Sequence, residues 1–279
     1  MNIGFIGAGN MGGAIIKGYA ASGAMAAADA LFVFDSDTEK AMALTGAGIP
    51  VDTTDSLAKL AGLCDTLVLC VKPNVMDTVL GELAELGAGD YGPEMQDRGK
   101  LIVSIAAGIS IGHIREKLGA HTRVVRVMPN TPAMVGEGMS AMSASDSLLE
   151  TDAGTAEKLF GAVGKAVWVA EELMDSVTGI SGSSPAYAYL YIEGLVRAGM
   201  EGGLSKETAT VMAAQSTLGA AKMVLENLGE TEPRQLCINV CSPGGTTIEA
   251  VKVLEEVSFV ETVSRAAQAS ASKSKLMTR

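Results

Sequence analysis

The sequence is poor in the side chains that most often bind metals or act as catalytic bases. It has two histidines, His113 and His121, and four cysteines in 279 residues. So few cysteines in a chain of this length do not make the disulfide framework of a small secreted domain. Cys237 and Cys241 have a spacing that suits one helix face, but both histidines are far away in the sequence, so we expect no metal site. The shortage of histidine also disfavours a Ser-His-Asp or Cys-His catalytic arrangement.

Positively charged clusters and long apolar runs are missing as well. Lys and Arg total 21 against 32 Asp and Glu, which gives a formal net charge of −11. A chain this acidic offers no basic surface to a phosphate backbone, so no nucleic-acid partner is expected. No apolar run reaches the roughly 18 residues of a membrane-spanning helix, and no basic segment followed by an apolar one opens the chain. We therefore expect no membrane association and a cytoplasmic location.

The first part of the chain alternates short apolar runs with amphipathic stretches. Strand-helix alternation with continuously apolar strands predicts a mainly parallel sheet that helices cover on both faces. We expect strands at 2–6, 31–34, 66–71, 101–105 and 123–128, with further strands at 138–142 and 166–170. We expect helices at 11–22, 38–45, 56–61, 75–86, 111–118 and 148–163.

The pattern changes after about residue 170. Strand-like runs nearly vanish, and helical periodicity takes over at 185–203, 206–227, 246–256 and 259–276. We therefore divide the chain into a domain at 1–170 and an all-helical domain at 171–279. The helical part is rich in Ala, Gly and Met, and small residues permit close helix packing. This composition fits two alternatives, packing against a second copy of the chain or an ordinary helical core.

A glycine-rich loop directly follows the first predicted strand and begins the first helix. In this strand-turn-helix setting, Gly7 makes the tight turn, Gly9 lets a pyrophosphate approach the backbone, and Gly12 allows close helix-strand packing. The free N–H groups at the helix start favour the anion. This predicts a Rossmann domain that binds NAD or NADP at 1–170. The predicted cofactor contacts here are Ile6, Gly7, Ala8, Gly9, Asn10, Met11 and Gly12.

The end of the second strand bears on the choice between the two dinucleotides. The Asp35 carboxylate can accept hydrogen bonds from the adenine-ribose hydroxyls of NADH and would repel a 2′-phosphate, or it can simply cap the next helix. The neighbouring Ser36 hydroxyl and Lys40 can instead serve a phosphate. These residues favour NADH only weakly.

Polar or small residues follow the later strands, at the edge of the sheet where ligands bind in such folds. Val71 ends one predicted strand and Lys72 and Pro73 follow it, Ala107 follows the next, and Asn130 lies in a proline-flanked loop after a third. We include all five among the predicted cofactor contacts, together with Ser56 at the start of the helix at 56–61.

Ser242-Pro243-Gly244-Gly245-Thr246-Thr247 stands out in the helical part. Two glycines and two threonines at a helix start form a good carboxylate site, and a plain helix cap needs only one hydroxyl. The surplus of small and hydroxyl residues favours a ligand.

Taken together, these motifs resemble the pyrroline-5-carboxylate reductase family over the whole length. The resemblance rests on FIGAGNMG at 5–12, VKP at 71–73, MPNTP at 128–132, ISGSSPAY at 180–187 and, above all, SPGGTTI at 242–248. It implies a Rossmann domain followed by a helical domain that dimerises, often with the dimers joined into rings. Ser184 departs from the glycine often found there, and the segment at 87–99 is longer than usual, with no role that we can assign.

The resemblance also implies the chemistry. NAD(P)H would give a hydride to the imine carbon of 1-pyrroline-5-carboxylate, which yields L-proline. Ser242, Gly244, Gly245 and Thr246 would bind the substrate carboxylate, and Thr247 would hydrogen-bond the ring nitrogen as the catalytic residue. Glu230 is a secondary candidate on the substrate side, or a solvated loop carboxylate. The family's usual preference for NADPH opposes the Asp35 argument, and the cofactor stays open.

Two other functions fit parts of the sequence. A β-hydroxyacid dehydrogenase shares this domain plan, but it needs a lysine early in the helical domain, where 185–203 offers only Arg197. A nucleotide-sensing protein would bind the cofactor without turnover, and the 242–247 segment would then have no role. The sequence leaves open the oligomer size, inhibition by proline, and activity on the six-membered imine homologue.

Overall fold

The computed structural model describes residues 1–25, 29–89 and 99–279. Its contacts form two compact units, which we call the sheet unit, Met1–Ser183 with Ala269–Arg279, and the helical unit, Ser184–Gln268. The sequence led us to place a domain boundary between residues 170 and 171, whereas these units divide the chain after Ser183 and before Ala269. The domain boundary at 170 stays a prediction. Of the segment at 87–99, residues 90–98 lie outside the described residues.

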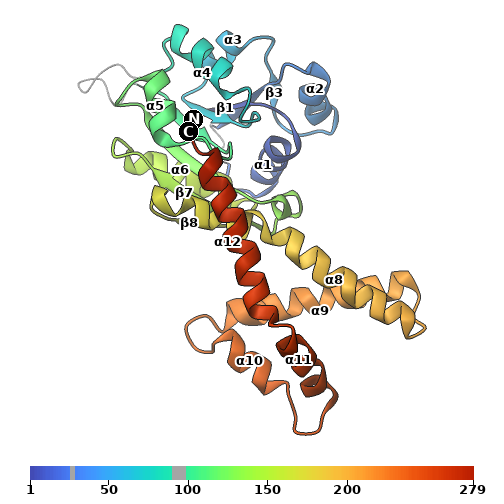
Figure 1. Cartoon of the computed structure of the whole chain (residues 1–279). Coiled ribbons are helices and arrows are strands. Elements are labelled where there is room, and N and C mark those ends of the chain that lie inside the picture. Colours follow the sequence, from blue (N-terminus) through green and yellow to red (C-terminus); the bar gives the residue numbers. More distant parts are fainter. Residues whose placement is uncertain (26–28, 90–98) are drawn as a thin grey trace. The chain divides into compact units, whose positions relative to one another are not determined.

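The sheet unit is built on one eight-stranded sheet with the order β3-β2-β1-β4-β5-β6-β7-β8 (Figure 1). Neighbouring strands are parallel throughout, except that β7 runs antiparallel to β6. The strands are β1 (Asn2–Ile6), β2 (Ala30–Phe34), β3 (Asp52–Thr53), β4 (Thr66–Leu69), β5 (Leu101–Ser104), β6 (Arg123–Met128), β7 (Gly138–Ala144) and β8 (Gly164–Trp168).

Helices cover both faces of this sheet, as the alternating sequence pattern predicts. Successive strand residues point to opposite faces, so Val103 belongs to the apolar cluster that includes residues of α1, α2 and α6. Its neighbour Ile102 belongs to the cluster that includes residues of α3, α4 and α5. The predicted doubly wound α/β class is therefore confirmed. These helices are α1 (Asn10–Ala21), α2 (Thr38–Gly46), α3 (Leu57–Leu63), α4 (Met76–Glu85), α5 (Ile111–Leu118) and α6 (Glu150–Gly161).

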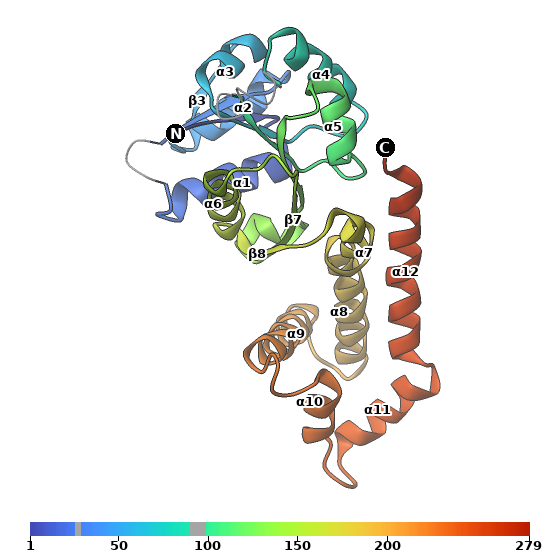
Figure 2. The ribbon, with the colours of Figure 1, turned by 90° about the vertical axis from the view of Figure 1, so that its left-hand side faces the viewer.

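The sheet unit also includes a short helical segment and the end of the last helix. After β8 the chain forms a single turn at Glu171–Leu173, then α7 (Met174–Val177) and a wider π-helical turn at Thr178–Gly182. Residues 269–279, at the end of α12 (Phe259–Met277), pack with this segment. In both ribbon views the end of α12 lies beside the start of α5 (Figures 1 and 2).

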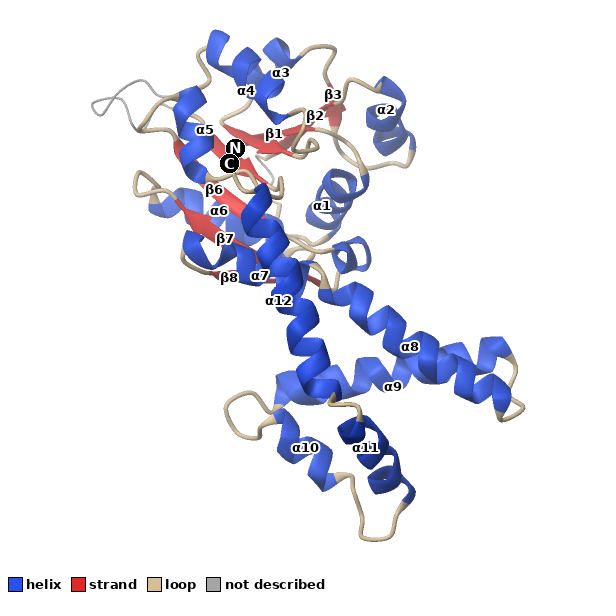
Figure 3. Ribbon diagram, in the orientation of Figure 1, coloured by secondary structure: helices blue, strands red, loops and turns tan. Residues whose placement is uncertain are grey.

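The helical unit contains no strand (Figure 3). It comprises α8 (Ser184–Glu201), α9 (Lys206–Glu226), α10 (Pro233–Asn239), α11 (Thr246–Glu256) and the first part of α12. Helices α8 and α9 pack closely, because a Cβ added to Gly199 would lie 2.9 Å from the Ala209 methyl. Throughout the described residues, no helix is both long and apolar enough to cross a membrane.

Candidate functional site: a dinucleotide site and a glycine-threonine helix start

Close packing fixes two of the three glycines in the loop after β1. Gly7 has a φ of 108°, and a Cβ there would lie 2.8 Å from the Cys70 carbonyl oxygen. A Cβ on Gly12 would overlap the Gly7 carbonyl oxygen, so α1 can approach β1 only with glycine at this position. These two residues shape the loop itself.

Gly9 differs from both, since nothing lies within 4 Å of the place where its Cβ would stand. It is the N-cap residue of α1, no side chain caps this helix, and the first turn carries no acidic residue. The first turn of α1 therefore has no side-chain cap, and the space beside Gly9 is open, which suits an anion at this helix start. This local geometry fits the pyrophosphate of a dinucleotide.

Two pockets of the sheet unit flank this loop, and together they are lined by eight of the predicted cofactor residues. The first, of about 260 Å³, is lined by Ala8, Gly9 and Asn10 and also by Lys17 and Lys40. The second, of about 240 Å³, brings together five predicted residues from β1, β2 and β4 or the loops that follow them: Ile6, Gly7, Asp35, Ser36 and Val71. Sequence reasoning missed Lys17, which lies on α1 seven residues after Asn10 and so on the same helix face.

The Asp35 carboxylate is held by the backbone. One of its oxygens accepts a hydrogen bond from the Ala8 N–H at 2.7 Å, and the other accepts one from the Asp37 N–H at 2.9 Å. Asp35 therefore ties the glycine-rich loop to the start of α2. Next to it, Lys40 forms an exposed ion pair with Asp37 at 3.0 Å, and this hydrogen bond raises the pKa of Lys40.

The other predicted cofactor residues lie at the same carboxyl edge, in varied environments. Ser56 caps α3 and accepts a hydrogen bond from the Lys59 N–H at 3.3 Å. Lys72 is exposed and Pro73 and Met11 are half-buried, whereas Ala107 is exposed between the buried Ala106 and Gly108. These positions leave Lys72 and Ala107 open to a ligand.

Asn130 is buried, and both ends of its side-chain amide are used within the sheet unit. The nitrogen donates to the Ser181 carbonyl oxygen at 3.0 Å, and the oxygen accepts from the Met139 N–H at 2.8 Å. It therefore joins the loop after β6 to β7 and to the segment before α8. Its predicted contact with the cofactor stays a prediction.

The predicted substrate segment forms a tight turn that leads into α11. Gly244 has a φ of 72°, and the Gly245 N–H donates to the Ser242 carbonyl oxygen at 3.0 Å. A Cβ on Gly245 would overlap the Ser242 hydroxyl as it is placed here and would lie 3.1 Å from the Ser242 carbonyl oxygen, so a larger residue would require the Ser242 side chain to rotate. Thr246 and Thr247 are exposed in the first turn of α11.

No side chain caps α11, although Ser242 precedes it by a few residues and Thr246 and Thr247 open it in the sequence. Gly245 is the N-cap residue, so the first N–H groups of the helix remain available to an anion. Glu230 is exposed in the turn between α9 and α10 and lines none of the pockets described here.

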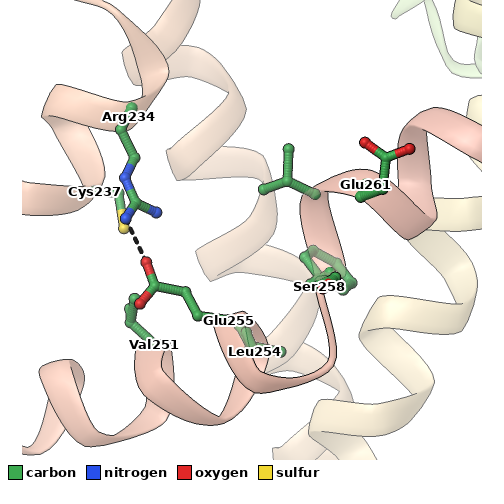
Figure 4. A pocket seen from close by; sticks show the side chains of 9 residues that line it. Arg234, Cys237, Val251, Leu254, Glu255, Ser258 and Glu261 are labelled. Atoms are coloured by element: carbon green, nitrogen blue, oxygen red, sulfur yellow. Dashed lines mark hydrogen bonds and ion pairs between the residues drawn. The ribbon is translucent and has the colours of Figure 1, made fainter.

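A separate pocket of about 500 Å³ lies in the helical unit (Figure 4). Figure 4 shows Arg234 of α10 paired with Glu255 of α11 across it, with Cys237 beside the guanidinium group. The hydrogen bond that Arg234 donates to the Glu255 carboxylate raises the pKa of Arg234. None of the predicted site residues lines this pocket.

The fold and the glycine-rich edge of the sheet define the class: a Rossmann protein with a dinucleotide site, followed by a helical unit. A family model described as pyrroline-5-carboxylate reductase dimerisation matches residues 171–277, and one described as NADP oxidoreductase, coenzyme F420-dependent, matches residues 2–108.

Known proteins of one family match nearly the whole chain. The pyrroline-5-carboxylate reductase of Escherichia coli is 39% identical over 257 residues, which cover 92% of this chain and 91% of that protein. The Pisum sativum enzyme of that name is 39% identical over 275 residues, with coverages of 98% and 94%.

Solved structures agree. The Coxiella burnetii pyrroline-5-carboxylate reductase superposes with a TM-score of 0.87 at 34% identity, covering 100% of this chain and 98% of that one. The Plasmodium falciparum pyrroline carboxylate reductase, solved with NADP bound, gives 0.84 at 33% identity with the same coverages. The chain belongs to the pyrroline-5-carboxylate reductase family, and it is an NAD(P)-dependent oxidoreductase. The resemblance seen in the sequence is thereby confirmed.

Proposed function

We propose that this protein reduces the imine bond of 1-pyrroline-5-carboxylate to give L-proline. The uncapped start of α11, with its glycine-threonine turn, is the observation that carries the proposal, together with family membership. Ser242, Gly244, Gly245 and Thr246 bind the substrate carboxylate, with the Gly244 and Thr246 N–H groups and the Ser242 hydroxyl as donors. The Gly245 N–H already donates to the Ser242 carbonyl oxygen, so Gly245 shapes the turn. At this helix end the backbone partial charges favour an anion.

Thr247 orients the ring nitrogen through its hydroxyl group. The bound dinucleotide supplies a hydride to the imine carbon, and the nitrogen either enters protonated or takes its proton from Thr247 or water. No histidine is required, because a protonated imine is already electrophilic. The protein therefore mainly positions the substrate against the cofactor, and such positioning can lower the activation free energy by roughly 7–11 kcal/mol.

We further propose that the glycine-rich loop binds the dinucleotide and that NADPH is preferred over NADH. Both oxygens of Asp35 already accept backbone N–H groups, and two lysines line the pocket beside Asn10. Lys17 and Lys40 therefore offer positive charge to a 2′-phosphate, whereas the Asp35 carboxylate has less capacity left for ribose hydroxyls. The NADP-bound relative supports this choice.

The assembly that we propose is a homodimer formed through the helical unit. The match of residues 171–277 to the family's dimerisation model supports it. The joining of dimers into a ring stays a prediction.

The test is the oxidation of NADPH and of NADH, measured with 1-pyrroline-5-carboxylate present or withheld. We expect imine-dependent turnover that is faster with NADPH. Thr247→Ala should lower kcat/KM about 10- to 100-fold through the lost hydrogen bond, while Thr262→Ala, an exposed threonine of α12, serves as the matched control. Cofactor binding without imine-dependent turnover would favour the nucleotide-sensing alternative, and equal rates for Thr247→Ala and the unaltered protein would remove the role of Thr247.

A further inference from the structure

The last eleven residues of the sequence, 269–279, return to the sheet unit and are fastened along its edge. The Ser270 hydroxyl hydrogen-bonds the Ser183 hydroxyl at 2.7 Å, and the Ser274 hydroxyl donates to Asp175 at 2.7 Å. Thr278 also donates to Asp175, at 3.3 Å. One face of this helix end is therefore attached to the segment between β8 and α8.

Beyond these contacts, Arg279 pairs with the turn that joins β5 to α5. Its N–H donates to the Gly108 carbonyl oxygen at 2.9 Å, and its own carbonyl oxygen accepts from the Ser110 N–H at 3.2 Å. Gly108 has a φ of 73°, and a Cβ there would lie 3.0 Å from the Met277 carbonyl oxygen. Glycine at 108 thus serves both the shape of the turn and the close approach of the chain end.

The Arg279 side chain adds a third attachment. Its guanidinium group donates to one oxygen of Asp77 at 3.1 Å, while the other oxygen of Asp77 lies 2.6 Å from His113 Nε2. Asp77 belongs to α4 and His113 to α5, so Arg279 is linked to the two helices that follow β4 and β5. The hydrogen bond with His113 and the Arg279 charge lower the pKa of Asp77, which keeps this carboxylate ionised.

The turn held in this way is one of the proposed cofactor contacts. Within 106–109, only Ala107 is exposed; the other three residues are buried. The backbone on both sides of the exposed position is therefore fixed, on one side by the core and on the other by Arg279.

We propose that residues 277–279 position the 106–110 turn for the dinucleotide, with Arg279 as a positioning residue for cofactor binding. The proposal rests on the proposed function only in that it takes Ala107 as a cofactor contact. Loss of the attachment lets the turn sample other conformations, so the cofactor must order it on binding and binds more weakly.

The experiment compares the unaltered protein with Arg279→Ala, with Arg279→Lys and with a variant that lacks residues 277–279. Lys158→Ala, which removes one exposed positive charge from α6, is the control. The dissociation constant for NADPH is measured from nicotinamide fluorescence. We expect it to rise about tenfold on removal of 277–279, where two backbone hydrogen bonds are lost, and about threefold for Arg279→Ala, where one exposed ion pair is lost. Arg279→Lys and the control should stay near the starting value.

Two further readouts separate positioning from a merely structural contribution. In the protein without cofactor, the Ser110 amide should exchange its hydrogen faster once 277–279 are removed, while amides of β1 and β4 keep their protection. The kcat at saturating NADPH should be unchanged, so that only the KM for cofactor rises. An unchanged NADPH dissociation constant in the shortened variant, with or without a lower melting temperature, would overturn the inference and leave the proposed function standing. Failure of the unaltered protein to bind either dinucleotide would overturn both.

Discussion

The two units of the molecule differ sharply in how they bury apolar side chains. In the sheet unit, β1, β4 and β5 are buried almost throughout, and two apolar clusters fill the space between sheet and helices. In the helical unit only Ala209 and Ala213 are buried. Large apolar side chains remain more than half exposed on its helices and turns, among them Leu190, Val211, Leu218, Leu228 and Val260.

This contrast shows that one unit is stabilised by its own core and the other is not. Burial of apolar surface supplies most of the free energy of folding, and a unit with two buried alanines gains very little of it alone. Large exposed apolar surfaces on a folded protein mark interaction sites. The helical unit thus requires a partner surface, as the family's dimerisation model implies.

The largest effect is expected from placing a charge on this apolar surface. Met212 of α9 and Met42 of α2 are similarly exposed, at 58% and 62%. Met212→Glu should weaken the dimer about 100-fold or more, because burial of an unpaired carboxylate in an interface costs several kcal/mol. Met42→Glu should change the free energy of unfolding by no more than ~0.5 kcal/mol. Sedimentation over a range of protein concentrations measures the dimer dissociation constant. Equal dissociation constants for Met212→Glu and Met42→Glu would contradict the idea that the helical unit alone needs a partner surface.

A smaller effect is expected from two glycines of one loop in the sheet unit. Gly12→Ala should destabilise the fold by about 1–3 kcal/mol, since the new methyl group overlaps the Gly7 carbonyl oxygen. Gly9→Ala meets no atom within 4 Å, and its φ of −66° suits alanine. It should leave the unfolding free energy unchanged but weaken NADPH binding about tenfold, because the methyl group fills space that the pyrophosphate needs. Chemical denaturation and fluorescence titration of both variants test this, and normal NADPH binding by Gly9→Ala would count against the proposed site.

The smallest effect concerns matched serine caps in the two units. Ser56 caps α3, and Ser205 caps α9, where it accepts from the Thr208 N–H at 3.1 Å. Replacement of either by alanine should cost about 1 kcal/mol. Ser205→Ala should lower the melting temperature of the helical unit. That melting temperature should also rise with protein concentration, since the helical unit is stabilised by association. Calorimetry at several concentrations measures both, and a Ser205→Ala transition independent of concentration would indicate that the helical unit folds alone.

Local signals predicted much of the fold. The bounds of β1, β6, α5 and α11 agree with those expected, because an apolar run or a capping residue marks each end in the sequence. The prediction missed β3, which consists of the two exposed residues Asp52 and Thr53 and is defined only by its pairing with β2. It also missed α10, a seven-residue helix whose proline at the first turn was the available signal.

The residues of the candidate site likewise fall into those that the sequence could predict and those that it could not. Positions whose role depends on the local backbone, such as Gly7, Gly9 and Gly12, are recognisable from sequence. Roles that depend on distant partners are not: the bonds of Asp35 to Ala8 and of Asn130 to Ser181 join segments that only the fold brings together. The pairing of Arg279 with Gly108 spans most of the chain and leaves no periodic or compositional trace.

The discontinuous make-up of the sheet unit has a consequence for synthesis of the protein. Residues 1–183 can collapse as soon as they leave the ribosome, but residues 269–279 become available only after the whole of 184–268 has been made. Contacts so distant in sequence carry the entropy cost of closing a long loop, and they form late in folding. The β5–α5 turn therefore gains its attachment only after residues 269–279 have been made, and a translation product interrupted before them would retain the sheet but lack this attachment.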